Sequence, residues 1–126
     1  HAIGLLDEPS VIRKKVMRAT TDSNPAVDFD SMGPGVINLL TIHQAFTGWT
    51  DDQMKQHFTG MRYGDLKKTV AEAVVAGLEP LQQRFREITA DPTYLRDTLR
   101  ESAARVSPVA NDTVRTVKQR MGIYTD

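Results

Sequence analysis

The sequence contains no cysteine, and this absence removes several kinds of chemistry. Disulfide bonds, thiolate nucleophiles and zinc sites with cysteine ligands are excluded. Net charge is also absent, because 16 Lys and Arg residues balance 16 Asp and Glu residues. No overall field therefore draws the chain onto nucleic acid or onto an anionic membrane, and any contact with RNA has to be local.

Long apolar runs are missing near the start of the chain. The longest one there, residues 2–6, is far shorter than the ~20 residues of a membrane span or the apolar core of a signal peptide. We therefore expect a soluble chain without a membrane partner, and the lack of cysteine suits a reducing, cytoplasmic location. With 126 residues, 40% of them hydrophobic, the chain suits a single domain, residues 1–126, around one core.

The apolar residues recur at every third or fourth position in five stretches, which predicts an all-α fold. Two long helices are expected at about residues 64–90 and 92–121. Almost no loop separates them, so we expect an antiparallel pair at the centre of a helical bundle. The shorter helices that pack against this pair are expected at about residues 8–19, 34–47 and 50–59.

Local signals define several helix ends. Asp7 is expected to cap the first helix, with Pro9 in its first turn, where the missing N–H costs nothing. Thr50 and Gln53 have the spacing of a capping box. Pro80 lies inside the first long helix, where loss of one backbone hydrogen bond predicts a bend without a break.

Patterns typical of an active site are not recognisable. The histidines, His1, His43 and His57, have no spacing that suits metal ligation, and His43 fits a core position. Asp28 and Asp30 lie two residues apart in a loop over residues 20–33 and could bind a hard cation, although solvated turn carboxylates explain them better. We expect no catalytic residue, metal or cofactor in this chain.

Two features favour binding of phosphate groups. One is the basic outer face of the first helix, and the other is the start of the first long helix, where free N–H groups and the helix dipole attract anions. An ordinary solvated helix surface would explain the first feature equally well, and an ordinary helix cap would explain the second. The candidate RNA contacts are Arg13, Lys14, Lys15, Arg18 and Arg62.

An ordered series of motifs resembles one known family over essentially the whole chain. The series comprises Ile3-x-Leu5-Leu6-Asp7-x-Pro9, Thr21-Asp22-Ser23, Gly33-Pro34-Gly35-Val36-x-Asn38-Leu39-Leu40, Tyr63-Gly64-x-Leu66-Lys67 and Leu78-x-Pro80-Leu81-Gln82-x-Arg84. In this order the motifs resemble the bacterial tryptophanyl-tRNA synthetases of class I.

The resemblance implies a role within a longer enzyme. Synthetases of this family make tryptophanyl-adenylate from tryptophan and ATP, with Mg²⁺, and then charge tRNA(Trp). Their catalytic domain carries HIGH and KMSKS signatures, neither of which occurs in this sequence. The chain resembles the helical C-terminal domain of the anticodon-binding type, which follows the KMSKS loop. The implied partners are tRNA(Trp) and the chain's own catalytic domain, in a cytoplasmic homodimer without DNA or membrane contacts.

The resemblance also gives two turns a possible role in movement between domains. The expected joint residues are Asp22 in the first turn, and Gly33, Pro34 and Gly35 in the second. Plain capping chemistry explains the same residues. The alternative function is a stand-alone helical module that binds RNA or protein without catalysis, for which the helix pair over residues 64–121 offers an exposed face.

Overall fold

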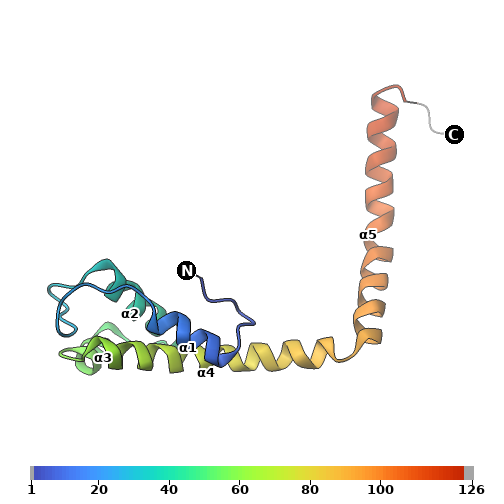
Figure 1. The fold of residues 1–126 in the computed structure, drawn as a ribbon. Helices are drawn as coiled ribbons and strands as arrows, with labels where there is room; N and C mark the ends of the chain where they lie inside the picture. The colour runs from blue at the N-terminus through green and yellow to red at the C-terminus, as the bar shows by residue number, and fades with distance from the viewer. Residues whose placement is uncertain (1, 124–126) are drawn as a thin grey trace. The chain divides into compact units, whose positions relative to one another are not determined.

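The structure, a computed structural model, describes residues 2–123 and consists mainly of five helices (Figure 1). They are α1 (Pro9–Met17), α2 (Pro34–Thr47), α3 (Asp51–Phe58), α4 (Tyr63–Thr89) and α5 (Pro92–Arg120). Residues 2–123 contain no strand. The all-α prediction is confirmed, and each helix begins and ends within two residues of its expected bounds.

The chain divides into two compact units, residues 1–83 and residues 84–126. The first unit holds α1, α2, α3 and most of α4, and the second holds the end of α4 and all of α5. The antiparallel pairing of α4 with α5 stays a prediction.

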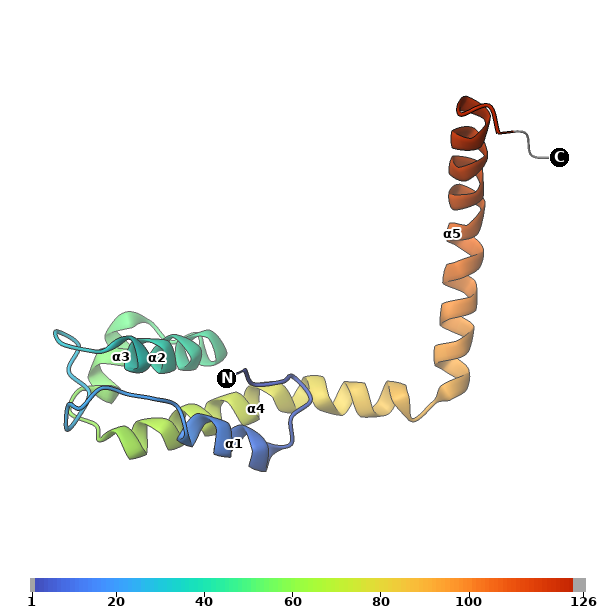
Figure 2. The same ribbon diagram turned by 45° about the horizontal axis from the view of Figure 1, so that its top comes forward.

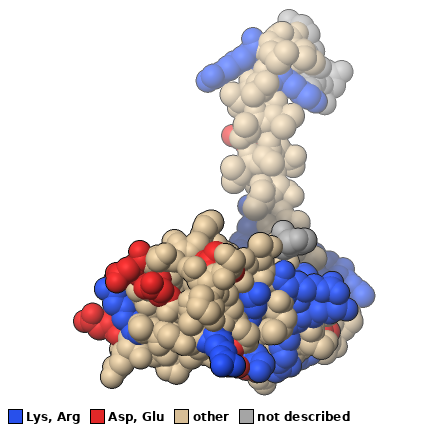
Figure 3. Space-filling view, turned by 60° about the vertical axis from the view of Figure 1, so that its left-hand side comes forward, with Lys and Arg blue, Asp and Glu red and all other residues tan. Residues whose placement is uncertain are grey.

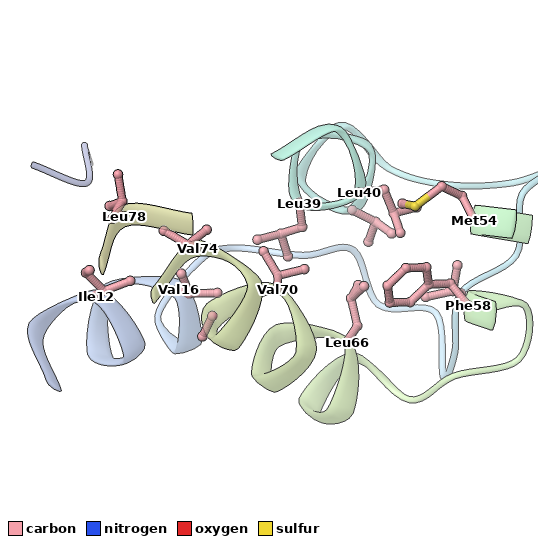
Figure 4. Packing of buried hydrophobic residues seen from close by; sticks show 13 residues of the cluster. Ile12, Val16, Leu39, Leu40, Met54, Phe58, Leu66, Val70, Val74 and Leu78 are labelled. Carbon is pink, nitrogen blue, oxygen red and sulfur yellow. The ribbon is translucent and has the colours of Figure 1, made fainter. Parts of the chain in front are cut away.

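Helix α4 supplies the centre of the core in the first unit. It buries at least one residue in every turn from Leu66 to Gln82 on a single face, and α1 and α2 lie along it (Figure 2). Side chains from α1, α2 and α3 meet this face, as Figure 4 shows. Each buried side chain of this size contributes about 1.5–3 kcal/mol by leaving water. The labelled core residues are Ile12, Val16, Leu39, Leu40, Met54, Phe58, Leu66, Val70, Val74 and Leu78.

The helix ends match the sequence signals at α3 and differ at α1. At α3 the Thr50 hydroxyl accepts a hydrogen bond from the Gln53 N–H at 3.3 Å, and the Gln53 carbonyl oxygen accepts one from the Thr50 N–H at 2.8 Å. Pro9 occupies the first turn of α1, as expected, but the cap position belongs to Glu8. The expectation for Asp7 was wrong because its carboxylate accepts from Lys15 Nζ at 2.6 Å and from the Gly4 N–H at 2.7 Å. A nearby cation outcompetes the helix amides for these oxygens.

The ordered segment between α1 and α2 is tied to the body of the first unit. Val27 is buried, its N–H donates to the Met61 carbonyl at 2.9 Å, and its carbonyl accepts from the Gly60 N–H at 2.9 Å. Gly60 has a φ of 76°, a left-handed conformation that favours glycine. The turn after α3 and the loop over residues 20–33 therefore hold each other in place.

The two long helices carry internal prolines and differ in burial. α4 continues without interruption through Pro80, and the bend expected there stays a prediction. α5 begins at an Asp91 cap, and none of its 29 residues is buried. Its apolar side chains recur at helical spacing and most of them are exposed; the large exposed ones are Tyr94, Leu99, Val106, Val109, Val114 and Val117. No helix in the described part of the chain is both long and apolar enough to span a membrane.

Candidate nucleic-acid interface

The basic face of α1 is less positive than its sequence suggests, because two of its four cations are paired. Arg13 donates two hydrogen bonds to the Glu72 carboxylate, from Nε at 2.7 Å and from Nη2 at 2.9 Å. This contact lowers the pKa of Glu72 and raises that of Arg13. Lys15 pairs with Asp7 at 2.6 Å, and its hydrogen bond lowers the Asp7 pKa.

Lys14 and Arg18 are the cations of α1 that remain available. Both side chains are exposed, and neither forms an ion pair with any described residue. They lie four residues apart, so they project from neighbouring positions on one helix face. In the view of Figure 3, the largest gathering of basic side chains on the helical body lies on the right, and most of the acidic ones lie on the left, where a smaller basic group also occurs. A gathering of this kind gives a globally neutral chain a local region that attracts phosphate.

Arg62 lies directly before α4, where the sequence predicted an anion-friendly helix start. Its carbonyl accepts the first helical hydrogen bonds, from the N–H groups of Asp65 and Leu66 at 3.0 Å each. The side chain is exposed and forms no ion pair among residues 2–123. Asp65 in the first turn of the helix offsets part of the positive dipole. The cation of Arg62, more than the helix end, is what a phosphate would meet here.

The expected joint residues gather around a single carboxylate. Asp22 accepts hydrogen bonds from the Tyr63 hydroxyl, from the Asn24 N–H at 3.0 Å and from the Gly33 N–H at 2.7 Å. The Tyr63 hydrogen bond is the main reason that the pKa of Asp22 is lowered. Burial and this same carboxylate raise the pKa of Tyr63 to about 12. Asp22 thus joins the turn after α1 to the starts of α2 and α4.

Close packing leaves no room for larger residues at this junction. A Cβ atom on Gly33 would lie 2.6 Å from an oxygen of the Asp22 carboxylate. On Gly35 it would lie 2.1 Å from the Thr20 carbonyl oxygen. Pro34 occupies the first position of α2, where its lack of an N–H is harmless. The four expected joint residues are therefore brought together, and their role in movement between domains stays a prediction.

A second cluster contains aromatic rings and lies where α2 meets α3. His43 is buried, and its ring contacts those of Trp49 and Phe58 edge-on, with centroids 4.9 Å away in each case. Trp49 in turn contacts His57 edge-on at 5.1 Å. Burial lowers the pKa of His43, which suits the predicted core role of this residue. Beside the rings is a hollow of about 430 Å³, lined by Trp49, Gln53, Gln56 and His57.

The remaining polar candidates are Asp28 and Asp30 in the loop before α2. Asp28 is exposed, and its carboxylate accepts the Asp30 N–H at 3.0 Å, as in an ordinary turn. No group of three or more potential metal ligands occurs in the described part of the chain. His1 lies outside the described residues.

Known proteins resemble this chain along nearly all of its length. No protein-family model matches it. The tryptophan–tRNA ligase of Wolinella succinogenes is 43% identical over 123 residues, which are 98% of this chain and 38% of that enzyme. The enzyme of the same name from Enterococcus faecalis is 43% identical over 122 residues, 96% of this chain and 36% of the relative. The enzyme of the same name from Thermosynechococcus vestitus is 41% identical over 121 residues, which are 95% of this chain and 37% of that enzyme. These matches fall in the C-terminal part of the relatives.

The chain belongs to the C-terminal part of the tryptophan–tRNA ligase family. The resemblance inferred from the motifs is thus confirmed. The chain spans less than two fifths of the length of these tryptophan–tRNA ligases.

For this part of a tryptophan–tRNA ligase, sequence reasoning missed both the pairing of the basic residues and the aromatic hollow. Glu72 lies 59 residues from Arg13, so no local pattern reveals their pairing. The hollow left a weak signal, because the one tryptophan of the chain and His57 lie eight residues apart on either side of a capping box. The spacing of Trp49 and Met54 on either side of this box indicates a hydrophobic staple, not a ligand site.

Proposed function

We propose that this chain is the tRNA-contacting helical part of a tryptophan–tRNA ligase. The similarity over 95–98% of the chain to enzymes of that name carries the proposal. In the complete enzyme, a catalytic domain outside this chain activates tryptophan with ATP and Mg²⁺ and charges tRNA(Trp). The present chain contacts the anticodon end of that tRNA.

The proposal extends to the setting of the chain. Its partners are tRNA(Trp) and the catalytic domain of its own polypeptide, in a cytoplasmic homodimer. The junction around Asp22, with Gly33, Pro34 and Gly35, is the joint about which this part moves against the catalytic domain. The three hydrogen bonds to the Asp22 carboxylate support this proposal, because they make the turns a compact element able to move as one piece.

The distribution of cations supports contact with a phosphate backbone. Phosphate contacts position a protein on RNA, whereas contacts to bases specify the sequence. Lys14, Arg18 and Arg62 are exposed cations without acidic partners in residues 2–123, so phosphates bind them without breaking an existing ion pair. Arg13 and Lys15 contribute less, because Glu72 and Asp7 already neutralise them.

The test compares paired and unpaired lysines on the same helix in the complete polypeptide. Binding of tRNA(Trp) is measured at several salt concentrations for Lys14→Ala, for Arg18→Ala and, as a matched control, for Lys15→Ala. Loss of one phosphate contact lowers the slope of log affinity against log salt by about 1. We expect this change for Lys14→Ala and Arg18→Ala, and a much smaller one for Lys15→Ala.

Two results would contradict the proposal. Equal slopes for the wild type, Lys14→Ala and Arg18→Ala would remove α1 from the tRNA interface. Failure of the complete polypeptide to attach tryptophan to tRNA(Trp) in the presence of ATP and Mg²⁺ would favour the stand-alone binding module instead.

A further inference from the structure

The hollow beside α3 is open to solvent and has the size of a small-ligand site. Its volume is about 430 Å³, within the roughly 300–1,000 Å³ that ligand sites occupy. Four side chains line it, Trp49, Gln53, Gln56 and His57. None of them is Lys, Arg, Asp or Glu, so the hollow suits an uncharged planar group better than a phosphate.

The position of Trp49 is fixed before any ligand arrives. Gly48 ends α2 with a φ of 67° and turns the chain sharply, and the Thr50–Gln53 capping box holds the start of α3. Between them, the Trp49 carbonyl accepts a hydrogen bond from Gln44 Nε2 at 3.0 Å. The indole ring also packs in a T-shaped contact against the buried His43 ring. A ligand that stacks on such a ring does not have to order it, so less of the binding energy is lost.

The two rings of the hollow form a corner. The planes of Trp49 and His57 stand at 84° with centroids 5.1 Å apart. The His57 side chain is exposed and Trp49 is partly exposed. A flat ligand that stacks on one ring therefore presents its edge to the other.

The two glutamines supply hydrogen-bonding groups at the edge of such a ligand. Gln53 uses its carbonyl oxygen in the capping box, which leaves its NH₂ group as a donor. The Gln56 side chain is exposed and its amide forms no hydrogen bond with another described residue, so both a donor and an acceptor remain. Side-chain amides match the donor and acceptor edges of nucleobases.

We propose that this hollow binds one unstacked nucleobase of single-stranded RNA, with Trp49 as the stacking face and Gln53 and Gln56 at the base edge. Sequence-specific recognition of RNA uses splayed bases on aromatic side chains in this way. The identity of the RNA rests on the proposed function. None of the cations Lys14, Arg18 and Arg62 lines the hollow. In this proposal the hollow contacts the base, and the cations contact the phosphates.

The test uses the emission of Trp49, the only tryptophan of the 126 residues. The complete polypeptide, with any tryptophan outside these 126 residues replaced by phenylalanine, is titrated with an RNA hairpin that carries the anticodon loop of tRNA(Trp), and with versions that lack one loop base at a time. We expect the intact hairpin to quench Trp49 emission. One of the abasic hairpins should bind without quenching, which would name the base.

Substitutions in the hollow provide the second measurement. Trp49→Ala should weaken binding about tenfold, the usual consequence of losing one stacked base, whereas Trp49→Phe should retain most of the affinity. Because Trp49 also packs against the core, Gln56→Ala serves as an exposed variant that leaves the fold intact. It should weaken binding severalfold, while the matched control Gln119→Ala on α5 should not.

The outcomes separate this inference from the proposed function. If the hairpin binds with the salt dependence expected of Lys14 and Arg18, but leaves Trp49 emission and the affinity of Gln56→Ala unchanged, the base site is wrong and the tRNA-contacting role stands. If the wild-type complete polypeptide binds neither the hairpin nor tRNA(Trp), both are wrong.

Discussion

Substitution of Gly35 by alanine tests the closest packing in the structure. Gly35 lies in the first turn of α2, where helix propensity alone predicts that alanine stabilises the protein by up to about 1 kcal/mol. The structure predicts the opposite sign. The new Cβ would lie 2.1 Å from the Thr20 carbonyl oxygen, and a backbone atom cannot move away as a flexible side chain can.

Overpacking of this kind costs about 1–3 kcal/mol. Even after the gain in helix propensity, the free energy of unfolding should fall by about 1–2 kcal/mol. For a protein of this size, each 1 kcal/mol lowers Tm by several degrees. The substitution should also loosen the turn that holds Asp22 and so weaken the junction around it.

Two other glycines in helices provide matched controls. A Cβ on Gly64 meets no atom within 4 Å, so Gly64→Ala should be neutral or slightly stabilising. At Gly77 the Cβ meets the Phe46 ring at 2.2 Å, but Phe46 is 40% exposed and can swing away, so the net effect should be small. Urea unfolding of the three variants measures the differences. If Gly35→Ala is as stable as Gly64→Ala, the packing argument is refuted.

Two further predictions concern Asp22 and the long helices. The lowered pKa of Asp22 stabilises the folded state above the ordinary value of 3.8 and ceases to do so as the pH falls through the folded value. Unfolding midpoints should therefore show Asp22→Asn destabilised at pH 7 and the gap to wild type shrinking below pH 3.8; a constant gap would contradict this role. Antiparallel pairing of α4 with α5 predicts a short distance between spin labels on cysteines that replace Ala76 and Arg105. That distance should equal the ~8–10 Å between the axes of packed helices plus the length of the label arms. The absence of native cysteine makes this labelling specific, and a separation of several tens of ångströms would contradict the pairing.

Features set by neighbouring residues could be predicted from the sequence. The periodic apolar residues placed all five helices, and the Thr50–Gln53 box was correct because both partners lie within one helical turn. The Asp7 cap was wrong although it was also a local signal. Lys15, two turns into the helix, offered its carboxylate a charged partner.

The contents of the candidate site depend on contacts between distant residues. Tyr63 reaches Asp22 across 41 residues, and Glu72 reaches Arg13 across 59. A single sequence gives residue types but not these pairings, so it overestimated the free charge on α1. Asp22, Gly33 and Gly35 were named as joint residues through family resemblance alone, and no physical pattern in the sequence indicated the close packing between them; their role as a joint stays a prediction.

The two fastenings of the loop over residues 20–33 affect the thermodynamics of any encounter with RNA. The backbone of Val27 is paired with Gly60 and Met61, and Asp22 holds the amides of Asn24 and Gly33. The chain entropy of this segment is therefore lost during folding and not during association. A partner that touches this loop would meet a surface that is already ordered. The binding entropy would then contain little unfavourable contribution from ordering the loop.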